Sequence, residues 1–375
     1  MGLWSLPISM VCAAATCACN VPVFRYALER WEPDPYLVIV FHNGQLTEQQ
    51  AAFVTAVEET SKEGLANLLV SKVDLSGKVP EHMEALWKEQ TNATVPWLVV
   101  KYPPPLGIPQ PVWAGPLNSE IVKTLIDSPA RREIARNLLE GKTAVWLLVE
   151  SGNNKRDTAL VRMLDTESRK LEKTLEFPEP DPFDPPMSTN LISRIAFSTV
   201  RISRSDPAEQ MLIRMLVNVD PELAATTEEM LFPVFGRGRA LPPAIGKDIR
   251  EDVINAMAEF MTGPCSCQVK EMNPGFDLLV AANWNAIFEG VEFEQPELPP
   301  LVSLSQFAMG ATNEPPTPTQ SLSAVPAALA TAEIPPPVDG GSSLVRNLVI
   351  VFSVGVFLIG VATFVFRSRS RKPVQ

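Results

Sequence analysis

Apolar and polar residues follow two different periods between residues 20 and 140. Short apolar runs that contain many β-branched residues are typical of strands that are buried on both faces. Such runs predict strands at residues 36–41, 68–73, 95–102 and 111–115. Apolar residues at helical spacing predict helices at residues 47–62, 80–89 and 118–126. The expected order of elements is therefore β-α-β-α-β-β-α.

A second series of strand and helix signals fills residues 141–295. Strands are expected at residues 144–150 and 196–203, and a hairpin at residues 231–236 and 240–245. Helices are expected at residues 155–175, 208–217 and 249–261. The pattern thus predicts two α/β domains in tandem, residues 20–140 and residues 141–295.

The order of elements in the first domain, with Val95-Pro96 just before the third strand, resembles the thioredoxin fold. The resemblance implies a cis peptide bond before Pro96 and two tandem thioredoxin-like domains. The family carries a Cys-x-x-Cys motif after the first strand, but residues 42–47 contain no cysteine, and none follows the first strand of the second domain. Thiol-disulfide exchange needs a reactive thiolate at that point. The resemblance therefore implies domains that are inactive in redox chemistry.

Both ends of the chain carry long uncharged stretches. Residues 1–19 have no charged side chain and are expected to form a signal segment. The stretch Thr16-Cys17-Ala18-Cys19 resembles a lipobox, which makes Cys19 a candidate for lipidation. An ordinary cleaved signal peptide and an uncleaved anchor are the alternatives.

The C-terminal stretch predicts a membrane anchor. Residues 348–366 carry no charge and are long enough to span a bilayer, and basic residues follow directly. We expect a transmembrane helix at residues 344–366 and a cytoplasmic basic tail at residues 367–375. Residues 296–343 contain many prolines and no basic residue, which predicts a semi-stiff linker. The predicted fold class is α/β, with two tandem thioredoxin-like domains and one C-terminal transmembrane helix.

Composition excludes several kinds of function. The formal net charge of -11 argues against nucleic acid as a partner, because phosphate binding needs clustered Lys and Arg residues. The two histidines lie far apart in the sequence, so a His-rich zinc site is not expected. No cofactor and no catalytic residue are predicted.

Cys265 and Cys267 form the one motif with a clear chemical character. Two thiols one residue apart could bind a soft metal ion or form a strained disulfide, and Lys270 could favour a thiolate. A role in packing or in a structural crosslink is the alternative. The Gly236-Arg-Gly-Arg239 stretch could cradle an anion, but a flexible turn with two solvated arginines is favoured. His42 is interpreted as a polar loop residue.

These observations lead to two functional hypotheses. The first is a membrane-anchored envelope protein whose redox-inactive domains act in binding or assembly with a protein partner, outside the cytoplasm. The alternative is a thiol-disulfide or metal-handling protein that works through Cys265 and Cys267. The missing Cys-x-x-Cys motif favours the first hypothesis.

Overall fold

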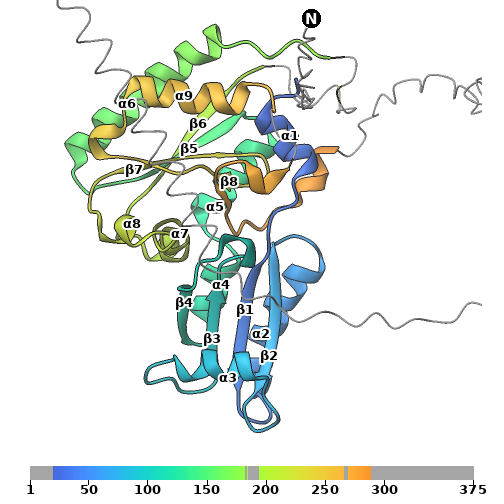
Figure 1. Ribbon diagram of the computed structural model, residues 1–375. Helices are drawn as coiled ribbons and strands as arrows, with labels where there is room; N and C mark the ends of the chain where they lie inside the picture. Colours follow the sequence, from blue (N-terminus) through green and yellow to red (C-terminus); the bar gives the residue numbers. More distant parts are fainter. Residues whose placement is uncertain (1–19, 182–183, 185–193, 266–268, 289–375) are drawn as a thin grey trace, which may run out of the picture. The chain divides into compact units, whose positions relative to one another are not determined.

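The computed structural model describes residues 20–181, 184, 194–265 and 269–288, which all fall within one unit of the chain (Figure 1). The strands of these residues form two sheets, one of four strands and one of six.

The smaller sheet has the strand order β2-β1-β3-β4. Its strands are β1 (Tyr36–His42), β2 (Leu68–Asp74), β3 (Trp97–Lys101) and β4 (Pro111–Pro116). β1 and β2 are parallel, whereas β3 is antiparallel to both β1 and β4. All four strands lie where the apolar runs predicted them. The peptide bond between Val95 and Pro96, just before β3, is cis.

Three of the predicted helices accompany this sheet. They are α2 (Glu48–Lys62), α3 (Glu81–Lys88) and α4 (Ser119–Ile126). Thr47 caps α2, because its side chain accepts a hydrogen bond from the Gln50 amide while the Gln50 side chain accepts one from the Thr47 amide. Asn118 caps α4 in a similar way, through the Ile121 amide. Local sequence signals thus account for the start of both helices.

The larger sheet has the order β10-β8-β7-β5-β6, with β9 also paired to β7. Its strands are β5 (Ala144–Val149), β6 (Phe197–Ile202), β7 (Met230–Phe235), β8 (Arg239–Ala240), β9 (Ala244–Ile245) and β10 (Phe276–Asp277). The remaining α-helices are α1 (Val23–Arg30), α5 (Pro129–Leu139), α6 (Asn154–Thr174), α7 (Gln210–Val217), α8 (Pro221–Ala225) and α9 (Glu251–Thr262). Short 3₁₀ helices are η1 (Pro104–Leu106), η2 (Pro207–Glu209), η3 (Gly246–Asp248), η4 (Lys270–Met272) and η5 (Trp284–Phe288).

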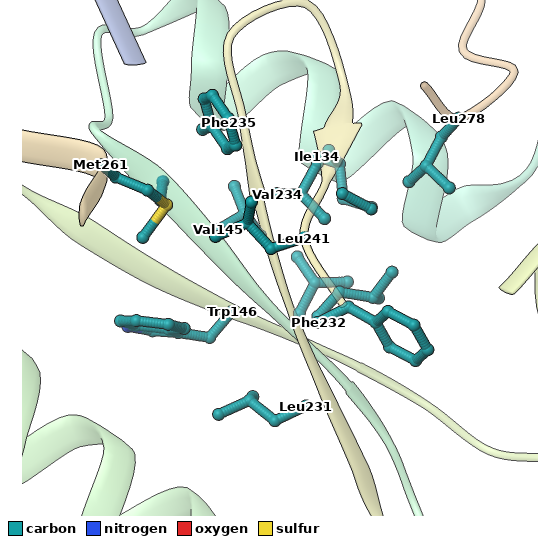
Figure 2. Close-up of a cluster of buried hydrophobic side chains, with 14 of the residues drawn as sticks. Ile134, Val145, Trp146, Leu231, Phe232, Val234, Phe235, Leu241, Met261 and Leu278 are labelled. Carbon is teal, nitrogen blue, oxygen red and sulfur yellow. The ribbon is translucent and has the colours of Figure 1, made fainter. Parts of the chain in front are cut away.

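The core of the larger sheet surrounds β5 and β7, whose residues are all buried (Figure 2). Trp146 and Phe232 are completely inaccessible to solvent. The Trp146 indole donates a hydrogen bond of 3.0 Å to the Ser168 hydroxyl of α6, so its polar group is satisfied within the core. The strand lies where the apolar run at residues 144–150 predicted it, and it is covered on both faces.

Two helices from the first part of the sequence complete this larger core. α1 buries Phe24 and Leu28 in it, and α5 buries Ile134 and Leu138. The α1 segment is held by backbone hydrogen bonds from Val23 to Gly263 and from Cys265 to Val21. The sequence signals did not predict α1. Its packing against the larger sheet could not be predicted either, because an apolar helix face does not reveal which sheet will cover it.

Residues that are distant in the sequence from the smaller sheet also pack in its core. Met211 and Met215 of α7 and Leu279, from the segment after β10, are buried with Val38 and Leu98 of the smaller sheet. The two cores are therefore built from interleaved parts of the chain.

The predicted fold class needs one correction. The α/β class fits the two mixed sheets, but no helix among the described residues is long and apolar enough to cross a membrane. The longest, α6, has 21 residues, but charged side chains recur along it and only one of its faces is apolar. The expected span at 344–366, the signal segment at 1–19 with Cys19, the linker at 296–343 and the tail at 367–375 all lie outside the described residues.

Replacement of Phe24 by alanine tests the packing of α1. Phe24 is 1% exposed, so Phe24→Ala should lower the free energy of unfolding by about 3–5 kcal/mol. Denaturant unfolding measures this loss. Leu69→Ala, at a side chain that is 54% exposed, is the control and should cost much less. Equal effects of the two substitutions would contradict the placement of α1.

Candidate functional site

One face of the smaller sheet is only partly covered. Alternate residues of β1, namely Leu37, Ile39 and Phe41, point to this face. The helix that packs on it, α3, has 8 residues and is about 12 Å long, whereas the 7 residues of β1 extend over about 23 Å. α3 covers the Phe41 end of the strand, where the ring centroids of Phe41 and Trp87 are 5.2 Å apart. Among the described residues, α3 leaves the Leu37 end open.

The open end forms a groove of about 360 Å³. Leu37 and Ile39 form its floor, and Met83 and Leu86 of α3 line one wall. The segment 102–108 forms another wall, through residues 102–104, 107 and 108. The apolar surface continues along the sheet, because Leu69 pairs with Leu37 in the strand register and is 54% exposed. Ile39 is 2% exposed and Leu37 is half-buried, so the face is partly covered; a partly covered apolar face of this kind is a candidate for protein interaction.

The groove has basic side chains but no acidic ones in its lining. Lys101 lies opposite Leu37 on β3 and therefore on the same face. Within the part of the chain that the structure describes, its ammonium group forms no ion pair. His82 of α3 is the second basic residue. The groove therefore suits an apolar group that is accompanied by a carboxylate.

The wall formed by residues 102–108 is rigid. The Tyr102 hydroxyl lies 2.9 Å from the carbonyl oxygens of both Arg214 and Met215, and burial raises the pKa of this phenol. Three consecutive prolines, residues 103–105, fix the backbone that follows. Gly107 ends the short helix η1 with a φ of 62°, a conformation that favours glycine. The shape of the groove is thus set before any ligand binds.

The end of the sheet where the resemblance implies thiols carries a hydrogen-bonded loop instead. His42 and Asp74 lie opposite each other at the carboxyl ends of β1 and β2. The His42 Nδ1 group donates to the Gly44 carbonyl at 2.8 Å. Asp74 accepts hydrogen bonds from the Gly44 amide and from the amide and hydroxyl of Ser76. No described residue of this loop is a nucleophile of the kind that exchange chemistry needs.

The Asp74 carboxylate should titrate well below an ordinary aspartate. The Ser76 hydroxyl, followed by the Gly44 and Ser76 amides, lowers its pKa from 3.8 to about 2. Because this pKa is depressed in the folded state, Asp74 contributes stability above pH 3.8 that is lost as the pH falls towards 2. An NMR titration of the carboxyl carbon measures the pKa directly.

The matched variants for this titration are Ser76→Ala and Ser205→Ala. The first removes the strongest hydrogen bond and should raise the pKa of Asp74 towards its ordinary value. The second alters a serine outside this loop and should leave the pKa unchanged. A pKa near 3.8 in the unmodified chain would show that the loop does not form as described.

The predicted cysteine site is only partly described. Cys265 is completely buried in the core of the larger sheet, whereas Cys267 lies outside the described residues. Among the described residues, no group of three or more His, Cys, Asp and Glu side chains could hold a metal ion. Burial keeps soluble reactants away from the Cys265 thiol, which favours a role in packing.

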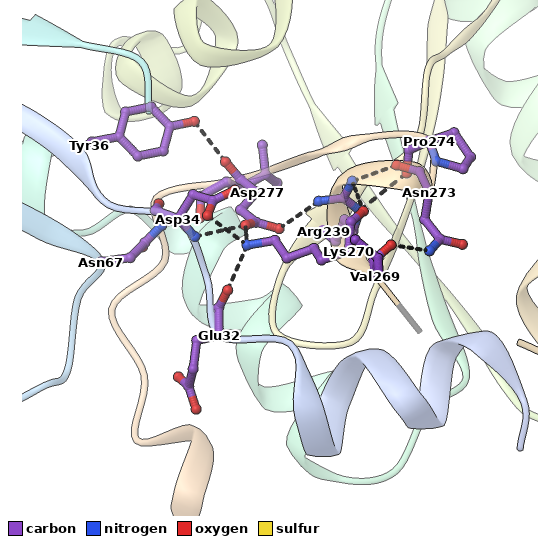
Figure 3. Close-up of polar contacts among 11 residues, drawn as sticks. Glu32, Asp34, Tyr36, Asn67, Arg239, Val269, Lys270, Asn273, Pro274 and Asp277 are labelled. Carbon is purple, nitrogen blue, oxygen red and sulfur yellow. Dashed lines mark hydrogen bonds and ion pairs between the residues drawn. The ribbon is translucent and has the colours of Figure 1, made fainter. Parts of the chain in front are cut away.

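Lys270 and Arg239 belong to a buried ionic cluster around Asp277 (Figure 3). The Lys270 ammonium lies 2.5 Å from Asp277 and 2.9 Å from Asp34, and it also donates to the Glu32 carbonyl. Burial raises the pKa of Asp34 above its ordinary value of 3.8, while the hydrogen bond from Lys270 acts in the opposite direction. With these partners, Lys270 stabilises carboxylates rather than a thiolate.

The prediction of a flexible turn with two solvated arginines is wrong. Arg237 and Arg239 are 7% and 5% exposed, and each forms an ion pair. Arg239 also donates to the carbonyl oxygens of Asn273 and Pro274 and lies over the Trp31 ring at 5.6 Å. A guanidinium group carries enough donors for several carbonyls and carboxylates, which allows both side chains to be buried.

Removal of the Asp277 carboxylate should destabilise the fold. Asp277→Ala leaves two buried cations without their shared partner, and we expect a loss of about 3–5 kcal/mol in the free energy of unfolding. Thermal or denaturant unfolding measures it. The control, Asp252→Ala, breaks an exposed pair with Arg250 and should have an effect close to experimental error. A negligible effect of Asp277→Ala would mean that the cluster does not hold the fold.

The sequence did not predict the groove residues as functional. Leu37, Ile39 and Met83 read equally well as core positions, because periodicity shows which side chains share a face but not what covers that face. One signal was available: measured in Å along its axis, the helix expected at residues 80–89 is shorter than the strands beside it.

Comparison of the chain with models of protein families, with curated proteins and with solved structures found no match. The thioredoxin-like resemblance therefore stays a prediction.

Proposed function

We propose that the chain is a binding protein that takes up a segment of a protein partner in the groove beside α3. The observation that carries this proposal is the apolar groove of about 360 Å³ on a sheet face that an 8-residue helix covers only in part. The absence of any thiol from the described residues at the carboxyl end of β1 supports binding over thiol exchange.

The expected occupant is a peptide segment with a large apolar side chain next to a carboxylate. The groove volume lies at the small end of the range of pockets that bind ligands, so it suits one or two large side chains. Leu37, Ile39 and Met83 supply the apolar contacts, and Lys101 supplies the charge for the carboxylate. The rigid wall at residues 102–108 lowers the entropy that binding costs.

The alternative function, through Cys265 and Cys267, has no specific observation in its favour. Cys265 is fully buried, and the lysine that was expected to activate a thiolate is paired with Asp277 and Asp34.

Selection from a display library of short random peptides, with the full chain as the target, tests the proposal. We expect the selected peptides to combine a large apolar residue with an acidic neighbour. Leu37→Asp should weaken their binding by about tenfold or more, because it places a carboxylate on the groove floor. Fluorescence polarisation with a labelled peptide measures the affinity.

Two further variants make this test specific. Lys101→Glu removes no ion pair among the described residues, so the fold should persist while acidic peptides bind at least about fivefold more weakly. Met272→Asp changes a side chain that is 74% exposed and does not line the groove, so it should leave binding unchanged. Equal weakening by Met272→Asp, or no weakening by the groove variants, would refute the proposal.

A further inference from the structure

A second, more polar cavity of about 140 Å³ lies away from the groove. It is lined by residues 32–33, 64–67 and 283–285, together with Arg237. At about 30 Å³ for each water molecule, this volume suits a ligand of only a few non-hydrogen atoms. Its lining shares no residue with the groove beside α3.

Arg237 brings a buried positive charge to this cavity. The side chain is 6% exposed, its Nε group donates to the Leu28 carbonyl at 2.8 Å, and its guanidinium lies 5.9 Å from the centre of the Phe288 ring. Nη1 lies 2.8 Å from both carboxylate oxygens of Glu32. Across the described part of the chain, Nη2 has no hydrogen-bond partner. The guanidinium therefore retains donors for a further acceptor.

The Glu32 side chain is the exposed partner of this charge. It is 79% exposed, although Arg237 is buried, so water can solvate the carboxylate once it leaves the guanidinium. The backbone of Glu32 is fixed separately, because its carbonyl accepts a hydrogen bond of 2.6 Å from Lys270. The carboxylate can thus rotate into solvent without disturbing the chain.

Two amide side chains add uncommitted hydrogen-bonding groups. Asn283 and Asn285 are exposed, and within the described residues their side chains form no hydrogen bond. Asn67, by contrast, is fully used, since it bonds to Asp34, Leu278 and Val280. Asn67 therefore fixes one wall, while Asn283 and Asn285 remain available to a ligand.

We propose that this cavity binds a small carboxylate, which replaces the Glu32 side chain on Arg237. In the structure, the Glu32 carboxylate occupies the position that the ligand carboxylate would take. Arg237 would bind the ligand through charge-assisted hydrogen bonds, and the amides of Asn283 and Asn285 would donate to its remaining oxygen lone pairs. The same chemistry is offered by a free small acid and by the C-terminal carboxylate of a protein chain.

An NMR titration of the isotopically labelled full chain tests this proposal with three probes. Acetate represents a free acid, N-acetylglycine represents a chain terminus, and N-acetylglycinamide lacks the carboxylate. We expect saturable shifts of the Trp284 indole and the Arg237 Nε signals with the first two probes and none with the third. Similar affinity for acetate and N-acetylglycine would indicate a free acid, and a clear preference for N-acetylglycine would indicate a chain terminus.

Each variant is first checked for folding by its amide NMR spectrum, because Glu32→Ala leaves the buried Arg237 without its carboxylate partner. Glu32→Ala removes the competing carboxylate and should tighten carboxylate binding by about tenfold. Asn285→Asp adds a negative charge and should weaken it, whereas Glu120→Ala, an exposed residue of α4, should have no effect. The proposal is overturned if no probe shifts the cavity signals, if the amide shifts them equally, or if Glu32→Ala leaves the affinity unchanged.

Discussion

The carboxyl group of Asp277 is the point on which both sheets depend. It accepts hydrogen bonds from the Asp34 amide, the Lys270 ammonium and, at a longer distance, the Arg239 guanidinium. The backbone carbonyl of Asp277 accepts a further hydrogen bond from the Tyr36 hydroxyl, at the start of β1. A buried carboxylate must be paired to be tolerated, so these partners have to come together for the fold to close. The start of the smaller sheet is thereby tied to the last strand of the larger one.

The segment that follows β10 also determines which face of the smaller sheet is covered. After β10, Leu279 enters the smaller core, and its carbonyl accepts a hydrogen bond of 3.1 Å from the buried Arg131 of α5. Helix α7 adds Met211 and Met215 on that side. Among the described residues, the helix that packs on the opposite face is α3, which is too short to cover it. The groove is thus a consequence of unequal cover, and the rigid wall after Tyr102 keeps it open.

Elements with strong local signals could be predicted from the sequence, and features that depend on distant contacts could not. The runs at residues 36–41 and 144–150, and the Thr47 cap, needed only local patterns. By contrast, the partners of Arg237 lie more than 200 residues away, at Leu28 and Glu32, so its burial could not be anticipated from the Gly-Arg-Gly-Arg stretch. The groove could not be predicted for a related reason. Leu37 and Ile39 fit the same apolar pattern whether or not a helix covers them.

We propose the half-covered face of the smaller sheet as the interaction surface of the chain. A structure of the chain in complex with a selected peptide provides the test. We expect an apolar side chain of the peptide to contact Leu37 and Ile39, with a peptide carboxylate within ion-pair distance of Lys101. A peptide bound instead at the His42 end of the sheet, or paired with the edge of β2, would contradict it.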